Sequence, residues 1–232
     1  MRTTVYIVLV AIVAGFGGFF LYRDFTTKTA LVAEPKAVSV PPKEQSASVV
    51  VPSQIPDVTL ANRAGTPTSV LSFAKPVVIY NFWATWCTPC RREIPLLNQL
   101  RRERAQSIEV VGIAVDFRDA VLKYAAEIDI RYPLLIGEED GLDALDAFGV
   151  PGAFPVSVFA DKDKRIVMVK LGELHADEAG FILDRIGDLN AGRLDMAAAK
   201  QQISAKLQEF AQNRAKAKSA SGGAASQQFN PG

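Results

Sequence analysis

The chain contains two cysteines, and both lie in the segment NFWATWCTPCRREIP, residues 81–95. A disulfide between Cys87 and Cys90 would close a very short loop, so it would constrain the unfolded chain little. Such a disulfide would stabilise the fold little. The spacing of the two cysteines favours a redox function over a structural one.

A run of β-branched and aromatic residues leads directly into Cys87 and predicts a buried strand followed by a helix. The unpaired amides and the dipole at a helix start favour a thiolate, which is the reactive form of cysteine. We therefore expect Cys87 at or just before the first helical turn, with a pKa below about 8.5. Cys90, one turn later, should be more buried. Cys87 would then attack a substrate disulfide, and Cys90 would resolve the mixed disulfide.

The neighbours of the cysteines fit this chemistry. Trp86 would cover the sulfur atoms with an apolar surface suited to a substrate peptide. Pro89 lacks an N–H and has a φ that fits a first helical turn. Pro95 should kink the helix that follows. The dipeptide between the cysteines influences the redox potential without fixing the direction of electron flow.

Other uses of two thiols need to be weighed. A zinc site would require more ligands, but His175 is the only histidine and no second cysteine pair exists. Two thiolates could hold copper(I), so a copper metallochaperone stays open as the alternative function. A merely structural pair is the third possibility.

The N-terminal region predicts a membrane anchor. Residues 5–22 contain no charge and no proline, and eighteen such residues suffice to cross a bilayer. We assign residues 1–24 to an uncleaved anchor, with a cleaved signal peptide as the alternative. Either assignment places the rest of the chain outside the cytoplasm. Residues 25–54, rich in Ala, Val, Pro, Ser and Lys, predict a flexible linker.

Residues 55–190 predict one α/β domain. Buried strands are expected at 76–84 and 107–115, a short strand within 132–137, and a hairpin of strands 156–160 and 165–171. Helices are expected from Cys87, from an Asp119 cap, over 141–148 and over 176–189. Strands that alternate with helices and end in a hairpin indicate an α/β sandwich with a mixed sheet.

Residues 191–232 form a separate C-terminal region with six basic and two acidic residues. A helix is expected over 194–218, with Ile203, Leu207 and Phe210 on one face. Residues 219–232 are low in complexity and predict disorder. The helix could pack on the domain as a solvated element or contact a partner or a membrane surface. The net charge of +1 over the whole chain gives no electrostatic case for nucleic acid.

The segment FWATWCTPCRREIP resembles the active-site segment of thioredoxin-like proteins. It is most similar to the membrane-anchored, TlpA/ResA-like branch of bacterial thiol–disulfide oxidoreductases. The resemblance covers residues 55–189. It implies a thioredoxin-like three-layer sandwich with a mixed sheet and a strand–helix insert, preceded by one transmembrane helix. Residues 132–148 fit the insert.

The resemblance also implies roles for individual residues. Cys87 would be the nucleophile, Cys90 the resolving thiol, and Pro155 a cis-proline that faces the disulfide and offers backbone to the substrate. Glu93 would handle protons near the cysteines, and the alternative is a solvated acid in the first helical turn. Asn81 stands where cytoplasmic thioredoxins carry a buried aspartate.

One departure concerns the loop before the cis-proline. The family usually has one residue between the last glycine and the proline, but GVPGAFP has two, and the second is the bulky Phe154. Substrate contacts are therefore expected from Trp86, Pro89, Phe154 and Pro155.

The function implied is a periplasmic reductant of protein disulfides, anchored in the bacterial inner membrane. It would need no metal or cofactor beyond the Cys87–Cys90 disulfide. Its electrons would come from a DsbD- or CcdA-type membrane donor, and apocytochrome c or copper-protein cysteines would be substrates. A peroxidase of the peroxiredoxin type is disfavoured, because Ala84 stands three residues before Cys87, where that active site usually has a threonine.

Overall fold

The computed structural model describes residues 50–150 and 152–225. The expected anchor and most of the expected linker lie outside these residues. Within the described ranges, no helix is both long enough and apolar enough to cross a membrane.

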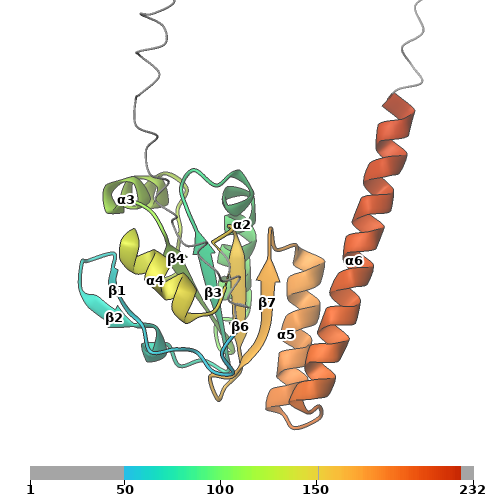
Figure 1. Ribbon diagram of the computed structural model, residues 1–232, viewed down its shortest axis with the longest axis horizontal. Coiled ribbons are helices and arrows are strands. Elements are labelled where there is room, and N and C mark those ends of the chain that lie inside the picture. The colour runs from blue at the N-terminus through green and yellow to red at the C-terminus, as the bar shows by residue number, and fades with distance from the viewer. Residues whose placement is uncertain (1–49, 151, 226–232) are drawn as a thin grey trace, which may run out of the picture. The chain divides into compact units, whose positions relative to one another are not determined.

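A seven-stranded sheet organises the domain, in the order β2-β1-β5-β4-β3-β6-β7 (Figure 1). Its strands are β1 Thr59–Asn62, β2 Pro67–Ser69, β3 Val77–Trp83, β4 Ile108–Ala114, β5 Leu134–Ile136, β6 Val156–Ala160 and β7 Ile166–Leu171. β3, β4 and β5 are parallel, whereas β6 and β7 run antiparallel to their neighbours at one side and β1 and β2 at the other. The predicted mixed sheet is confirmed.

Helices cover both faces of the sheet. They are α2 Thr88–Glu103, α3 Arg118–Glu127, α4 Glu139–Ala147, α5 Ala176–Asn190 and α6 Met196–Ala225, with a short 3-10 helix η1 at Val70–Ser72. Buried side chains of α2, α3, α5 and α6 share one core with alternate residues of β3 and β4. The apolar residues between them, Val78, Tyr80, Phe82, Val111 and Ile113, face a second core with α4 and η1. This is the predicted three-layer sandwich, and β5 with α4 is the predicted insert.

One sequence expectation about a helix start was wrong, and hydrogen bonding to the β6–β7 hairpin begins slightly before residue 55. Asp119 does not cap α3; the cap is Phe117, and Asp119 lies in the first turn, where its charge still complements the helix dipole. Asp116 Oδ1 accepts a hydrogen bond from the Phe117 N–H, directly before this helix. The chain also pairs with the hairpin before residue 55, since Ile166 N–H donates to the Ser53 carbonyl.

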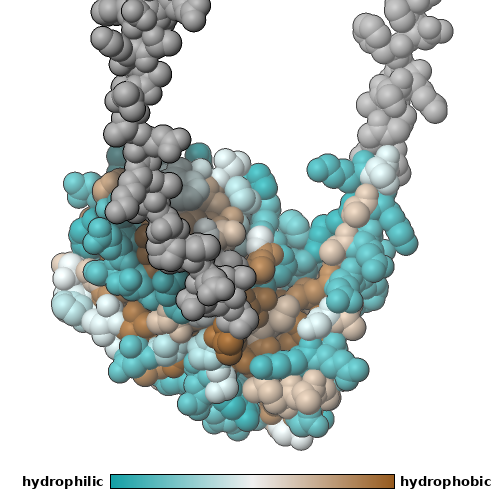
Figure 2. Space-filling view, in the orientation of Figure 1, coloured by the Kyte–Doolittle hydropathy of each residue, from teal (hydrophilic) through white to brown (hydrophobic). Residues whose placement is uncertain are grey.

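The C-terminal helix is part of the domain. Ala199 and Ile203 of α6 are fully buried, and Leu207 packs against the same core, as the expected apolar face requires. α6 runs alongside α5 (Figure 1), and Figure 2 shows apolar surface where α6 meets the domain and a hydrophilic outer side. Packing on the domain is thus confirmed for the first half of α6.

The expected boundary between helix and disordered tail was also wrong. α6 continues to Ala225, seven residues past the expected end at 218. A helix already fixed by packing extends more easily than it starts, so α6 continues through residues 219–225 although Gly222 and Gly223 are poor helix formers.

The packing of α6 generates a stability prediction. Ile203→Ala should lower the free energy of unfolding by about 2–5 kcal/mol, because it empties a fully buried site. Denaturant unfolding of the full-length protein measures this. Lys200→Ala, one turn earlier and exposed, is the matched control and should change little. Equal, small effects of both variants would contradict the packing of α6 on the domain.

Candidate active site

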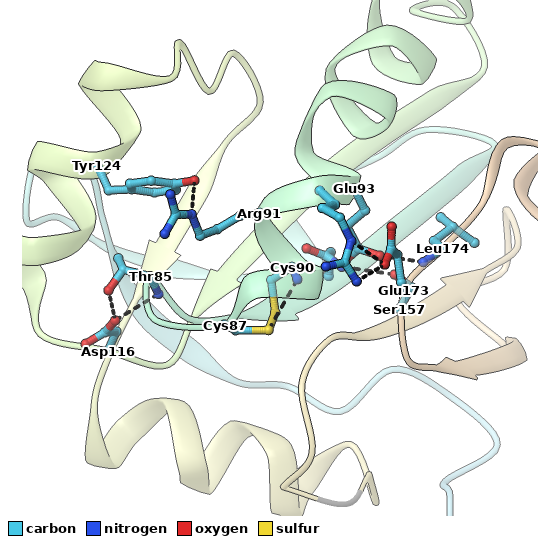
Figure 3. Close-up of a disulfide and its surroundings, with 12 residues drawn as sticks. Thr85, Cys87, Cys90, Arg91, Glu93, Asp116, Tyr124, Ser157, Glu173 and Leu174 are labelled. Atoms are coloured by element: carbon cyan, nitrogen blue, oxygen red, sulfur yellow. Dashed lines mark hydrogen bonds and ion pairs between the residues drawn. A yellow bond between two sulfur atoms is a disulfide. The ribbon is translucent and has the colours of Figure 1, made fainter. Parts of the chain in front are cut away.

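The cysteines follow the C-terminal end of β3, an internal strand of the sheet. All seven residues of β3 are buried, and the strand ends at Trp83, four residues before Cys87. Thr85 is then fixed by Asp116, which follows β4: the Asp116 carboxylate accepts hydrogen bonds from the Thr85 N–H, at 2.9 Å, and from the Thr85 hydroxyl (Figure 3). The loop before Cys87 is therefore tied to the neighbouring strand.

Cys87 is the N-cap residue of α2, as predicted. Its Sγ accepts a hydrogen bond from the N–H of Cys90 at 3.3 Å, and Pro89 is the second residue of the helix. A disulfide joins Cys87 and Cys90, whose Cα atoms are 5.3 Å apart. In the reduced protein the same N–H and the helix dipole would face the Cys87 sulfur and favour its thiolate.

Aromatic side chains border the disulfide. Trp86 is 68% exposed, although it directly precedes the buried Cys87. Its ring meets that of Phe154 edge-on, with centroids 5.8 Å apart, so the loop before β6 lies beside the active-site loop. The peptide bond between Phe154 and Pro155 is cis, as expected from the resemblance. The contacts of these residues and of Pro89 with substrate stay predictions.

Glu93 is the sixth residue of α2, beyond its first turn, and is buried, with 1% of its surface exposed. One carboxylate oxygen accepts a hydrogen bond from Asn81 Nδ2 at 2.7 Å, and the other accepts one from the Leu174 N–H at 2.6 Å. Asn81 Nδ2 also donates to the Ser157 hydroxyl at 3.0 Å. The structure thus contradicts the alternative of a solvated acid and makes Asn81 a partner of Glu93.

The environment of Glu93 shifts the pKa of its carboxyl group towards neutral pH. Burial raises the pKa of Glu93 to about 7, even though the hydrogen bonds from Leu174 and Asn81 lower it. The neighbouring Glu173 carboxylate raises this pKa further, and Lys170 lowers it. A carboxyl group that titrates near neutral pH can both take up and release a proton under working conditions.

The sequence did not reveal several residues of this site. Asp116 was unassigned, although its place at the end of a buried strand is a signal that could have identified it. Ser157 and the backbone of Leu174 gave no signal, because they reach Glu93 from distant parts of the chain. Among the described residues, no three or more His, Cys, Asp and Glu side chains form a group that could hold a metal ion.

Comparison with known proteins agrees with this geometry. Residues 51–169 match the model of the AhpC/TSA family. The chain belongs to the AhpC/TSA family. Two curated relatives of this thioredoxin-like kind match it over most of their length. The thiol–disulfide oxidoreductase ResA of Geobacillus thermodenitrificans is 27% identical over 188 residues, which are 80% of this chain and 94% of that protein. The thioredoxin-like protein YneN of Bacillus subtilis is 30% identical over 183 residues, 76% of this chain and 94% of that protein.

A solved structure supports the fold. The thiol:disulfide interchange protein of the thioredoxin family from Chlorobium tepidum TLS superposes with a TM-score of 0.51 at 28% identity. The superposition covers 61% of this chain and 97% of the other. The thioredoxin-like fold and the resemblance to the ResA-like branch are thereby confirmed.

The buried Glu93 generates a prediction about pH and stability. In the folded state the pKa of Glu93 is about 7, whereas in the unfolded chain it has the ordinary value of 4.5. The stabilisation from this proton is complete below about pH 4.5 and is lost as pH rises towards 7. Relative to Glu93→Gln, which stays neutral, the wild type should lose about 3 kcal/mol of unfolding free energy across this window.

Denaturant unfolding of the disulfide form at a series of pH values checks this. Glu103→Gln, which removes an exposed carboxylate at the other end of α2, should keep the wild-type pH dependence. A wild-type curve parallel to that of Glu93→Gln would contradict the raised pKa.

Proposed function

We propose that this protein is a membrane-anchored, periplasmic reductant of protein disulfides, of the kind that cytochrome c or copper-protein maturation requires. It would cycle between the dithiol and the disulfide of Cys87 and Cys90 without another cofactor. The observation that carries the proposal is the Cys87 N-cap of α2 combined with the neutral-pH acid Glu93 one turn beyond Cys90.

As a thiol–disulfide oxidoreductase, the protein exchanges one disulfide for another in two steps. The Cys87 thiolate attacks one sulfur of the substrate disulfide, the substrate S–S bond breaks, and the released substrate thiolate takes up a proton. Cys90 then loses its proton and attacks the Cys87 sulfur. The mixed disulfide breaks, and the second substrate thiol leaves. Two electrons have then passed from the dithiol to the substrate.

Glu93 is suited to the second step. Cys90 is fully buried, so its thiol cannot give its proton directly to bulk water. A carboxylate with a pKa of about 7 can accept that proton and later return it. Asn81 occupies the place of a charged residue in cytoplasmic thioredoxins, and its amide cannot do this. We assign proton transfer to Glu93 for this reason.

Location and direction belong to the proposal. The uncharged stretch at residues 5–22 supports an anchor in the inner membrane with the domain in the periplasm. An oxidising compartment would drive the pair to the disulfide. A reductant there needs a two-electron donor in the membrane, for which a DsbD- or CcdA-type protein is suited.

Substrate trapping in cells tests the proposal. Full-length Cys90→Ser should accumulate mixed disulfides at Cys87, because the resolving thiol is missing. These adducts should appear in the membrane fraction on non-reducing gels, disappear on reduction, and contain exported proteins. Mass spectrometry identifies them.

Cys87→Ser is the matched control and should trap little, because Cys90 is fully buried. The absence of disulfide-linked partners, or partners confined to the cytoplasm, would contradict the proposal. Tight copper(I) binding by the reduced protein without disulfide exchange would instead favour a metallochaperone.

A further inference from the structure

α6 lies outside the residues matched to the AhpC/TSA family, which end at 169. One of its side chains nevertheless reaches a buried carboxylate near the active site. The Arg214 guanidinium contacts Asp177 Oδ2 at 3.1 Å and binds Glu178 Oε1 at shorter range. Glu178 lies in the first turn of α5 with only 3% of its side chain exposed. A buried carboxylate is costly unless cations or hydrogen-bond donors face it.

Glu178 connects Arg214 to the neighbouring strand. Its other oxygen, Oε2, lies 3.5 Å from Lys170 Nζ and accepts a hydrogen bond from the His175 N–H at 3.1 Å. Lys170 and Arg214 are the cationic partners of Glu178 among the residues that the structure describes. The two cations therefore share one carboxylate.

Lys170 in turn closes the loop between β7 and α5. Its ammonium donates to the carbonyls of Leu171, at 2.9 Å, and Glu173, at 3.1 Å. The same loop touches two parts of the active site. The Gly172 N–H donates to the carbonyl of Pro155, and the Leu174 N–H donates to Glu93 (Figure 3).

These contacts form one continuous path from the C-terminal helix to the acid of the active site. We propose that Arg214 is a positioning residue for Glu93: by sharing Glu178 with Lys170, it keeps Lys170 on the loop whose Leu174 N–H binds the Glu93 carboxylate. The inference rests on the proposed function of Glu93 in disulfide exchange. The proposal gives α6 a role in disulfide exchange, because α6 supplies Arg214, the cation at the end of this path farthest from Glu93.

The direction of the effect follows from the charges. Without Arg214, Glu178 keeps Lys170 as its cation and draws the ammonium away from the loop carbonyls. The Leu174 N–H then holds the Glu93 anion less well, so Glu93 retains its proton to higher pH. Four other charged or titratable groups lie around Glu93 and Glu178 and are expected to stay in place: Arg92, paired with Glu173; Asp177; His175; and Tyr132, whose pKa is raised by burial and further by the Glu93 charge.

Carbon-13 NMR of the Glu93 carboxyl reads this effect directly. The sample is the full-length, disulfide-form protein in detergent, labelled at glutamate carboxyls and assigned with Glu93→Gln. In Arg214→Gln the titration midpoint of Glu93 should rise by roughly half a pH unit or more. Lys200→Gln removes an exposed cation of the same helix, fourteen residues before Arg214, and it should leave the midpoint unchanged. An unchanged midpoint in Arg214→Gln would overturn the proposal.

Two further variants separate positioning from a general structural effect. Arg214→Lys keeps the charge but cannot span Asp177 and Glu178 as a fork, so its midpoint should lie between those of the wild type and Arg214→Gln. Should Arg214→Gln fail to fold, Arg214→Lys carries the same test. In a Glu178→Gln background, Arg214→Gln should shift the midpoint much less than in the wild type.

A full shift in the Glu178→Gln background would overturn the path through Glu178. The titration needs no exchange activity and no substrate. A failure of the trapping experiment would therefore leave the titration result intact, so a failure of one hypothesis can be told apart from a failure of the other.

Discussion

The structure depends on one local constraint, the capping of α2 by Cys87. β3 is buried on both faces and ends four residues before this cysteine. The sulfur therefore lies beyond the C-terminal end of β3, where α2 begins. The Cys90 N–H points at the Cys87 sulfur, and Pro89, the second residue of the helix, has no N–H that would need a partner. Asp116 fixes the preceding loop from the neighbouring strand. Exchange chemistry follows from this placement, because a helix start favours a thiolate and the neighbouring Trp86 is exposed to a partner.

A second constraint is the place of the buried acid. Asn81 on β3 carries no charge, and the carboxylate comes instead from Glu93 on the facing helix. The two side chains bond each other, so the strand orients the acid that the helix supplies. The remaining oxygen of Glu93 is bound by the loop that also reaches Pro155. The acid, the cis-proline loop and, through Lys170, the C-terminal helix are therefore parts of one connected arrangement.

The sequence predicted the parts of the fold that depend on local pattern. Runs of β-branched residues located β3 and β4, and the hairpin of β6 and β7 was placed to within a residue. β1 and β2 were missed, because TLAN and PTS are short, partly polar and stabilised mainly by pairing. The burial of Glu93 was undecidable from sequence, since an acid near the start of a helix looks the same whether solvated or buried. Its partner Leu174 lies 81 residues away. The anchor at residues 1–24 stays a prediction.

The most direct test of the central claim compares the two thiols in the reduced full-length protein. Iodoacetamide labelling at a series of pH values, followed by peptide mass spectrometry, gives the alkylation rate at each cysteine. Capping of α2 by Cys87 predicts that this residue reacts about tenfold faster than Cys90 or more at neutral pH, and that its reactivity persists to lower pH than that of an ordinary thiol. Equal rates at the two cysteines, with the pH dependence of a free thiol at both, would contradict the account.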